Sequence, residues 1–158
     1  MPTQQETLIC VLDDDASVLK AMRRLLRSAG LQVMVFEEAG AFLEHAETHA
    51  MALAILDIWM PGINGLEVQR RLLEVSPATP VIVMTGRDAP AMRRLAVAQG
   101  AAAFFAKPFR DEALLRAIRA TLPAASLKQL PPQKRSAESK GPRRTVGSIP
   151  RRGRTKVS

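Results

Sequence analysis

The sequence predicts an α/β fold in which a doubly wound parallel sheet of five strands is covered by five helices. Short apolar runs occur five times between residues 8 and 106, and each is followed by a segment whose apolar residues have helical spacing. The runs are apolar throughout instead of alternating, which is typical of strands buried on both faces of a parallel sheet. Aromatic residues make up only 4% of a chain that is 47% hydrophobic, so we expect a mainly aliphatic core.

The expected strands are short apolar segments, and the first of them contains the β-branched residues Ile9 and Val11. Right-handed crossovers between parallel strands leave few topologies, although periodicity alone does not give the strand order. The five strands are expected at residues 8–12, 33–36, 53–56, 81–85 and 101–106.

Each expected helix places its apolar residues three or four positions apart, so that they share one face. Gly30 and Gly100 follow the first and fourth helices where a C-terminal cap belongs, and Pro123 ends the fifth. The expected core faces are Val18, Met22, Leu25, Leu26 and Ala29; Ala39, Phe42, Leu43 and Ala46; Val68, Leu72 and Val75 of the helix 65–75; Met92, Leu95 and Ala96; and Leu114, Leu115, Ile118 and Leu122.

A change in composition divides the chain into an expected domain at residues 1–123 and a basic tail at residues 124–158. The tail holds ten of the 23 Lys and Arg residues and one acid, Glu138. It has no aromatic residue and few aliphatic ones, so we expect it to be disordered. Two interpretations stay open: a solvated extension, or a segment that binds nucleic acid non-specifically through phosphate contacts.

Composition argues against several other classes of protein. No apolar run approaches the ~20 residues of a membrane-spanning helix, and the polar start MPTQQET lacks the pattern of a signal peptide. The single cysteine, Cys10, cannot form an internal disulfide and is expected to be a small buried hydrophobic residue. We therefore expect a cytoplasmic protein without a membrane span.

Polar side chains follow the expected strands at their C-terminal ends. They are, in chain order, Asp13–Asp15, Asp57, Thr85 and Lys107. Because the C-terminal ends of parallel strands lie at one edge of the sheet, these side chains should converge there. Oxygen ligands without His or Cys are typical of a site for a hard cation, most naturally Mg²⁺.

The same set of groups is suited to phosphoryl transfer. A carboxylate can act as the nucleophile and take a phosphoryl group as an acyl phosphate. The transfer itself depends on positioning and on neutralising the charge of the phosphoryl oxygens. Asp57 is the expected nucleophile because it is the lone carboxylate after the central strand, and Thr85 and Lys107 are the expected neutralising groups.

Residues 8–122 resemble the receiver domain of response regulators, the phosphorylated half of two-component signalling systems. The resemblance rests on four motifs in order and at the right spacing: LDDD at 12–15, DIWMPGING at 57–65, MTG at 84–86 and KPF at 107–109. Residues 83–109 are most similar to the FixJ-like subgroup, whose members usually carry a C-terminal helix-turn-helix. Nothing after residue 123 has the apolar periodicity of such an output domain.

The resemblance implies a flavodoxin-like fold with strand order 2-1-3-4-5. It also implies that a sensor histidine kinase phosphorylates Asp57, and that the domain catalyses only its own phosphoryl transfer and dephosphorylation. Mg²⁺ would be bound by Asp13, Asp14, Asp57 and the backbone carbonyl of Trp59.

Other positions receive roles from the same resemblance. Thr85 and Lys107 would bind the phosphoryl group, and Phe104 would be the aromatic residue that switches between buried and exposed positions. The peptide bond before Pro108 would be cis. Trp59 and Arg87 would tune the lifetime of the phosphoryl group.

Some residues also have a plainer interpretation. Asp15 is expected to cap the helix that follows it. Phe104 would serve equally as a core residue, in which case Phe105 is the alternative switch residue. His45 and His49 are expected to be solvated side chains of the second helix.

Three functions follow from these observations. The first is a phosphorylation-dependent signalling switch that contacts a downstream protein, or a second copy, through the fourth helix, fifth strand and fifth helix. The second is a DNA-binding transcriptional regulator that acts through the tail 124–158. The third is a phosphate sink or shuttle in a phosphorelay.

Overall fold

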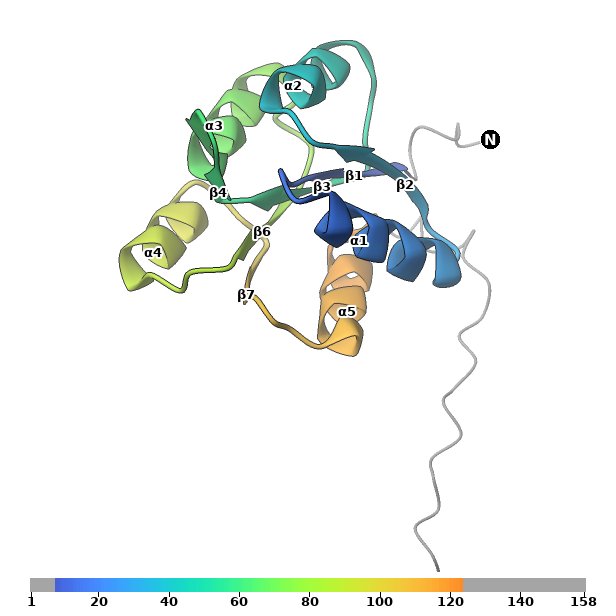
Figure 1. Cartoon of the computed structure of the whole chain (residues 1–158). Helices are drawn as coiled ribbons and strands as arrows, with labels where there is room; N and C mark the ends of the chain where they lie inside the picture. The colour runs from blue at the N-terminus through green and yellow to red at the C-terminus, as the bar shows by residue number, and fades with distance from the viewer. Residues whose placement is uncertain (1–7, 124–158) are drawn as a thin grey trace, which may run out of the picture.

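The computed structural model describes residues 8–123 and places a five-stranded parallel sheet between two layers of helices (Figure 1). The sheet strands are β1 (Leu8–Leu12), β2 (Gln32–Phe36), β3 (Leu53–Asp57), β6 (Val81–Thr85) and β7 (Ala103–Ala106). Their spatial order is β2-β1-β3-β6-β7, and every neighbouring pair is parallel. Counted along the chain this is the order 2-1-3-4-5, which confirms the expected flavodoxin-like topology.

Five helices cover the two faces of the sheet. Helices α1 (Ala16–Ser28) and α5 (Asp111–Thr121) pack on one face, and α2 (Ala39–Thr48), α3 (Gly65–Val75) and α4 (Pro90–Ala98) pack on the other (Figure 1). Connections from β1 to β2 and from β2 to β3 therefore lie on opposite faces. The direction of winding reverses between β1 and β3, where ligands bind in open α/β sheets.

The core consists of two apolar layers separated by the sheet. Alternate strand residues face opposite layers, so that Ile55 contacts the α1/α5 layer and Leu56 the α2/α3/α4 layer. Both residues are fully buried. Cys10 is also fully buried, and burial raises the pKa of its thiol to about 12. This confirms the expectation of a small buried hydrophobic residue.

A two-stranded hairpin follows β3 that the sequence did not indicate. Its strands are β4 (Trp59–Met60) and β5 (Ile63–Asn64), paired antiparallel around Pro61 and Gly62. Two-residue strands are too short to give an alternating pattern, which explains why periodicity did not detect them. The hairpin lies at the same edge of the sheet as the C-terminus of β3.

Several expected helix faces were partly wrong. In α1 the buried residues are Leu19, Met22 and Leu26, whereas Val18, Leu25 and Ala29 are only half-buried at the edge of the core. In α3 and α4, residues expected in the core are exposed: Val75 is 40% and Leu95 48% accessible. Ala96 is the one fully buried residue of α4. The helical spacing of apolar residues therefore predicted where each helix lies in the chain, but it did not predict in full which of its residues are buried.

Other boundaries agree with the expectation to within two residues. Strand β7 begins at Ala103 instead of 101, and β3 includes Asp57 itself. Gly30 and Gly100 follow α1 and α4 with φ of 79° and 94°, which confirms both expected helix ends. Within residues 8–123, no helix combines the length and the apolar character needed to cross a membrane. The basic tail 124–158 lies outside the described residues.

Candidate functional site

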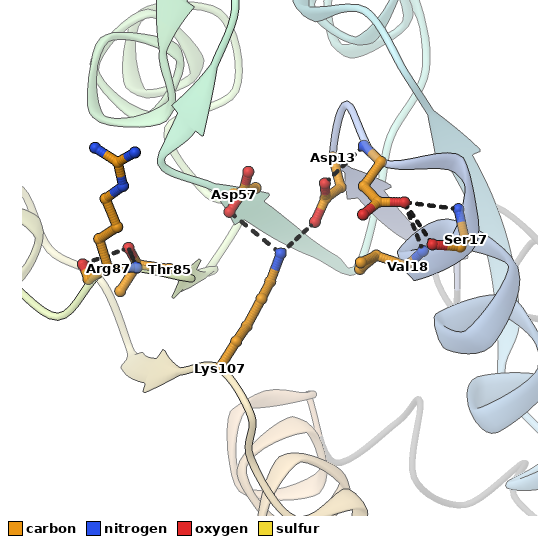
Figure 2. A network of polar contacts seen from close by, with 8 residues as sticks. Asp13, Ser17, Val18, Asp57, Thr85, Arg87 and Lys107 are labelled. Atoms are coloured by element: carbon orange, nitrogen blue, oxygen red, sulfur yellow. Dashed lines mark hydrogen bonds and ion pairs between the residues drawn. The ribbon is translucent and has the colours of Figure 1, made fainter.

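Polar side chains from three sheet strands meet at the C-terminal edge of the sheet. Asp13 directly follows β1, Asp57 ends β3, and Lys107 directly follows β7. The three side chains point toward one another in Figure 2, with the ammonium group between the two carboxylates. The parallel topology therefore brings these side chains together as the sequence predicted.

Three carboxylates form the acidic part of the site. One carboxylate oxygen each from Asp13, Asp14 and Asp57 lie within 4.8 Å of one another. Asp13 and Asp57 are only 1% and 4% accessible, whereas Asp14 is exposed. Two acids are therefore deep in the site, and the third lies at its mouth, where a cation can enter.

Lys107 compensates part of this negative charge. Its Nζ lies 2.7 Å from Oδ2 of Asp13 and 3.4 Å from Oδ1 of Asp57. Burial opposes the charge of the ammonium, but the hydrogen bond from Lys107 to Asp13 and the charges of Asp13 and Asp57 outweigh it and raise the pKa of Lys107. Three carboxylates face one ammonium group, so the cluster retains a need for further positive charge.

Asp57 has the properties of an activated carboxylate. Burial, followed by repulsion from Asp13 and more weakly from Asp14, raises its pKa to about 6, although Lys107 acts in the opposite direction. The group is therefore mostly ionised at neutral pH and more basic than an exposed aspartate. A more basic carboxylate is a better nucleophile, which suits an acceptor of a phosphoryl group.

Local packing fixes the backbone at Asp57. The amide of Ile58 donates to the carbonyl of Met84, and the amide of Gly65 donates to the carbonyl of Ile58, at 3.0 Å and 2.8 Å. A Cβ at position 65 would collide with the carbonyl oxygen of Asp57. Glycine is therefore required at this position by the close approach of α3 to the end of β3. No periodicity or charge pattern marks such a contact, and the sequence interpretation gave Gly65 no role beyond beginning the helix.

The cap of α3 completes this arrangement. Asn64, the last residue of the hairpin, accepts a hydrogen bond from the amide of Leu66 at 2.8 Å. The hairpin β4–β5 and the start of α3 thus form one continuous turn beside Asp57. The DIWMPGING segment folds into this turn, which explains why a proline, an asparagine and two glycines occur so close to the acid.

Asp15 is the N-cap of α1, as its plainer interpretation predicted. Its Oδ1 accepts hydrogen bonds from the Ser17 hydroxyl at 2.6 Å and from the amides of Ser17 and Val18 at 2.9 Å and 3.4 Å (Figure 2). These bonds lower the pKa of the exposed carboxyl group. The amide of Asp15 in turn donates to Oδ1 of Asp13 at 2.9 Å. The cap therefore helps to orient Asp13.

Thr85 is fully buried at the end of β6, and its hydroxyl bonds to the backbone of Arg87. Oγ1 donates to the Arg87 carbonyl at 2.7 Å and accepts from the Arg87 amide at 3.0 Å (Figure 2). The Thr85 hydroxyl therefore has both its donor and an acceptor position occupied by the Arg87 backbone. A role in binding a group at Asp57 would require the bond to the Arg87 carbonyl to break.

Trp59 and Arg87 lie together at the outer side of the site. The guanidinium carbon of Arg87 is 5.8 Å from the centre of the Trp59 ring, which is 40% exposed. This cation–π contact links the hairpin after β3 to the loop after β6. The two residues expected to tune the site are thus neighbours, although their effect on phosphoryl lifetime stays a prediction.

The two phenylalanines of β7 belong to different layers. Phe104 is half-buried against the α2/α3/α4 layer, and the guanidinium of Arg93 lies 4.8 Å from its ring centre. Phe105 packs in the α1/α5 layer and contacts Phe109, with ring centres 5.5 Å apart. Phe104 therefore faces the same layer as α4, while Phe105, which is also half-buried, packs on the opposite face. The Lys107–Pro108 bond that follows is cis.

The two histidines are less solvated than expected. His49 is exposed, but His45 is half-buried, and its ring stacks on that of His49 with centres 4.5 Å apart. Its Nε2 is buried and has no hydrogen-bond partner. Burial, followed by the charge of His49, lowers the pKa of His45. The expectation of a solvated His45 was wrong because Phe36 of the edge strand packs beside it.

The donor set fits a hard divalent cation. Asp13, Asp14 and Asp57 are the one group of three or more His, Cys, Asp or Glu side chains within residues 8–123 whose ligand atoms lie close enough to share an ion. All three offer oxygen, which Mg²⁺ prefers. The exposed position of Asp14 leaves room for the water ligands that Mg²⁺ usually keeps.

Comparison with known families gives a match over most of the described residues. The model of the response regulator receiver domain matches residues 9–119. The response regulator protein TmoT of Ectopseudomonas mendocina is 44% identical over 133 residues, which cover 84% of this chain and 58% of TmoT. The response regulator protein TodT of Pseudomonas putida is 42% identical over 134 residues, or 85% of this chain and 56% of TodT. The chain thus spans less than two thirds of the length of these relatives.

Solved structures agree with the fold. A CheY-like receiver domain protein from Methanospirillum hungatei JF-1 has a TM-score of 0.71 at 27% identity, covering 77% of this chain and 97% of that one. The response regulator StyR has a TM-score of 0.65 at 41% identity and covers 73% of this chain and 58% of its own.

Proposed function

The chain belongs to the response regulator receiver domain family, and on this basis we propose that it is a signalling switch controlled by phosphorylation of Asp57. One observation carries the proposal: a buried, basic carboxylate at the end of the central strand lies 3.4 Å from a lysine ammonium and beside two further carboxylates. A structural aspartate at the end of a strand would need neither the burial nor the acidic neighbours.

The reaction follows from the position of the Asp57 carboxylate. A carboxylate oxygen attacks the phosphorus atom of a phosphohistidine on a sensor kinase, forming an O–P bond. The P–N bond breaks, and its electron pair stays on the imidazole, which then takes up a proton. Because the pKa of Asp57 is about 6, the attacking group is mostly ionised at neutral pH without a separate general base.

Two other groups prepare the site for the charge of the phosphoryl oxygens. Lys107 is held by Asp13 at 2.7 Å, so its ammonium stays beside Asp57 before the donor arrives. Asp13, Asp14, Asp57 and the backbone carbonyl of Trp59 would hold Mg²⁺, which when bound supplies positive charge to the phosphoryl oxygens.

Thr85 provides the change of conformation. Its hydroxyl exchanges the Arg87 carbonyl for an oxygen of the phosphoryl group, which releases the backbone of the loop after β6. That loop leads into α4, whose residues Leu95 and Val97 are 48% and 58% exposed. We propose the face formed by α4, β7 and α5 as the surface that contacts a downstream protein or a second copy.

Phe104 connects this face to the acidic site. It lies in β7 in register with Val83 of β6, two residues before Thr85. Arg93 of α4 covers its ring, so a shift of α4 would change the exposure of Phe104. Its role as a switch residue is proposed on this contact. Nucleic-acid binding by residues 124–158 and a cytoplasmic location stay predictions of the sequence, and no observation on the described residues favours a role as phosphate sink.

Incubation of the full chain with Mg²⁺ and acetyl phosphate tests the proposal. Intact-protein mass spectrometry should show the addition of one phosphoryl group, and Asp57→Asn should abolish it. Asp111→Asn is the matched control, since it removes an exposed carboxylate in the first turn of α5 that has no part in the acidic site, and it should leave labelling intact. Labelling that survives in Asp57→Asn would show that another group is the acceptor.

A further inference from the structure

Two neighbouring hollows lie beside helix α2 on the face that carries α2 and α3. One has a volume of about 370 Å³ and lies between Asp14, the loop before α2 and the β4–β5 hairpin. The other has a volume of about 360 Å³ and lies between α2 and α3, which lie side by side (Figure 1). Gly40 lines both hollows. The two hollows therefore adjoin at this residue, and we name the pair the α2 groove.

The position of Gly40 keeps this groove open. A Cβ built at residue 40 would meet no atom within 4 Å. Gly40 is the second residue of α2, and nothing in the packing requires glycine there. The absent side chain leaves open the part of the lining that the two hollows share.

The lining of the α2 groove contains both acidic and apolar residues. The acids are Asp14, Glu37, Glu38, Glu44, Glu47 and Glu74, and the apolar residues include Leu43, Met60, Ile63 and Val75. Arg71 is the one basic residue in the lining, and its guanidinium is bonded to Glu67 at 3.2 Å. Within the described part of the chain, no ion pair engages Glu37, Glu38, Glu44 or Glu47. The groove thus offers negative charge that its own neighbours leave uncompensated.

The chain itself contains a segment of opposite charge. Residues 124–158 carry ten Lys and Arg against one acid, and six of these basic residues lie between 143 and 156. In that stretch, RRTVGSIPRRGRTK, Val146 and Ile149 lie between the arginine pairs 143–144 and 151–152. Interleaved basic and apolar residues are complementary to a lining of acidic and apolar residues. A polyanion such as nucleic acid is repelled by the same groove.

The linking residues are long enough for this contact. The 19 residues from 124 to 142 span up to about 65 Å when fully extended, and a domain of this size is about 35 Å across. Because the segment is tethered, its effective concentration at the groove is of millimolar order, so that weak charge pairs suffice. We infer that residues 143–156 dock intramolecularly in the α2 groove. The inference does not depend on phosphorylation of Asp57.

Paramagnetic relaxation in the full chain tests the inference. Ser148→Cys carries a nitroxide label, and the native Cys10 does not react because it is fully buried with a thiol pKa of about 12. At low ionic strength the amide signals of Gly40, Glu44 and Glu47 should lose at least about half of their intensity. The loss should disappear in 1 M salt, where the Debye length is about 3 Å.

Matched variants separate docking in the groove from general attraction to acids. Glu44→Gln with Glu47→Gln, or Gly40→Arg alone, should remove the intensity loss on α2. Asp111→Asn with Glu112→Gln removes the same charge from exposed positions on α5 and should leave the loss unchanged. Equal broadening on all faces, or no response to the α2 variants, would refute docking.

A mixed sample decides whether the segment docks in its own molecule. Isotope-labelled chains without the nitroxide are mixed with nitroxide-labelled chains that are invisible in the spectrum. Intramolecular docking predicts no broadening on α2 in this mixture. Broadening as strong as in the singly labelled sample would mean that the groove takes the segment of a second copy, and the inference as stated would be wrong.

Discussion

The ammonium of Lys107 donates to Oδ2 of Asp13 at 2.7 Å, although the two residues lie 94 positions apart in the chain. The contact joins the end of β1 to the loop after β7 at the C-terminal edge of the sheet, where β3 and β6 lie between these two strands. Lys107 is closer to Asp13 than to Asp57, so the proposed acceptor keeps the weaker of the two bonds. In this arrangement the lysine is held in place by one carboxylate while the other remains free to react.

Removing the lysine should therefore destabilise the fold. Lys107→Met leaves Asp13 and Asp57 buried without their common partner, and we expect a loss of about 2 kcal/mol in the free energy of unfolding at neutral pH. The loss should shrink at lower pH, where the carboxyl groups take up protons. Urea unfolding at pH 7.5 and pH 4.5 measures it. Lys20→Met, an exposed lysine on α1, should change stability by less than about 0.5 kcal/mol.

Removing the charge of Asp57 should have the opposite effect. Its pKa is raised from 3.8 to about 6, so the folded state binds a proton that the unfolded state has already released between these values. The carboxyl group of Asp57 therefore contributes fully to the free energy of unfolding below pH 4, and this contribution is lost as pH rises through 6. Asp57→Asn should thus raise the free energy of unfolding by about 2–3 kcal/mol at pH 7.5 without metal, and by little at pH 4. A gain that is equal at both pH values would contradict the titration.

The half-buried His45 should make the fold less stable as pH falls, which is opposite to the effect of Asp57. Burial lowers the pKa of His45 below 6.5 in the folded state, so the unfolded state takes up a proton first as pH falls. Stability should decrease below pH 6.5 in the wild type and less so in His45→Leu, whose side chain cannot titrate. Thermal unfolding of both proteins at pH 5.5 and pH 7.5 compares the two slopes. Parallel slopes would remove His45 as the cause.

The close approach of α3 to the end of β3 at Gly65 can be tested with two glycine variants. Gly65→Ala forces a Cβ into the carbonyl of Asp57, and we expect a loss of about 1–3 kcal/mol together with slower labelling by acetyl phosphate. Gly40→Ala is the control, because the added methyl group meets no atom and should stabilise α2 by up to about 1 kcal/mol. Urea unfolding of both variants checks the difference. Equal stabilities would show that α3 can withdraw from β3 at no cost.

The single tryptophan offers a direct probe of metal binding. Trp59 is 40% exposed beside Arg87, two residues after Asp57, so a cation at the three carboxylates should alter its surroundings. Titration with Mg²⁺ should change its fluorescence in a saturable manner. Asp13→Asn should weaken the response, whereas Glu112→Gln, on the first turn of α5, should not. A flat titration of the wild type would argue against a metal at this loop.

The positions of Asp13, Asp57 and Lys107 could be predicted from the sequence because parallel strands force their C-terminal ends to one edge. A residue placed after such a strand has few other places to lie. The strand order could not be predicted in this way, because an apolar run does not show which strands are its neighbours in the sheet. It was predicted from the family resemblance alone.

What the sequence did not reveal depends on contacts that leave no pattern. The fit of Gly65 against Asp57 involves only backbone atoms. The bonds of Thr85 to Arg87 depend on a rotamer, and the burial of His45 depends on Phe36 across the edge of the sheet. Leu95 has the spacing of a core residue, yet it is 48% exposed, and Ala96 is the residue of α4 that is buried instead.

Helix α4 is attached to the core by very little. Ala96 is its one fully buried side chain, its N-cap makes no side-chain hydrogen bond, and two of its aliphatic residues are largely in water. An alanine contributes little apolar area, so moving the helix by a turn breaks few favourable contacts. The remaining helices each anchor at least two buried side chains. Among the described helices α4 is therefore the least firmly anchored, and displacing it should cost less free energy than displacing any of the other four.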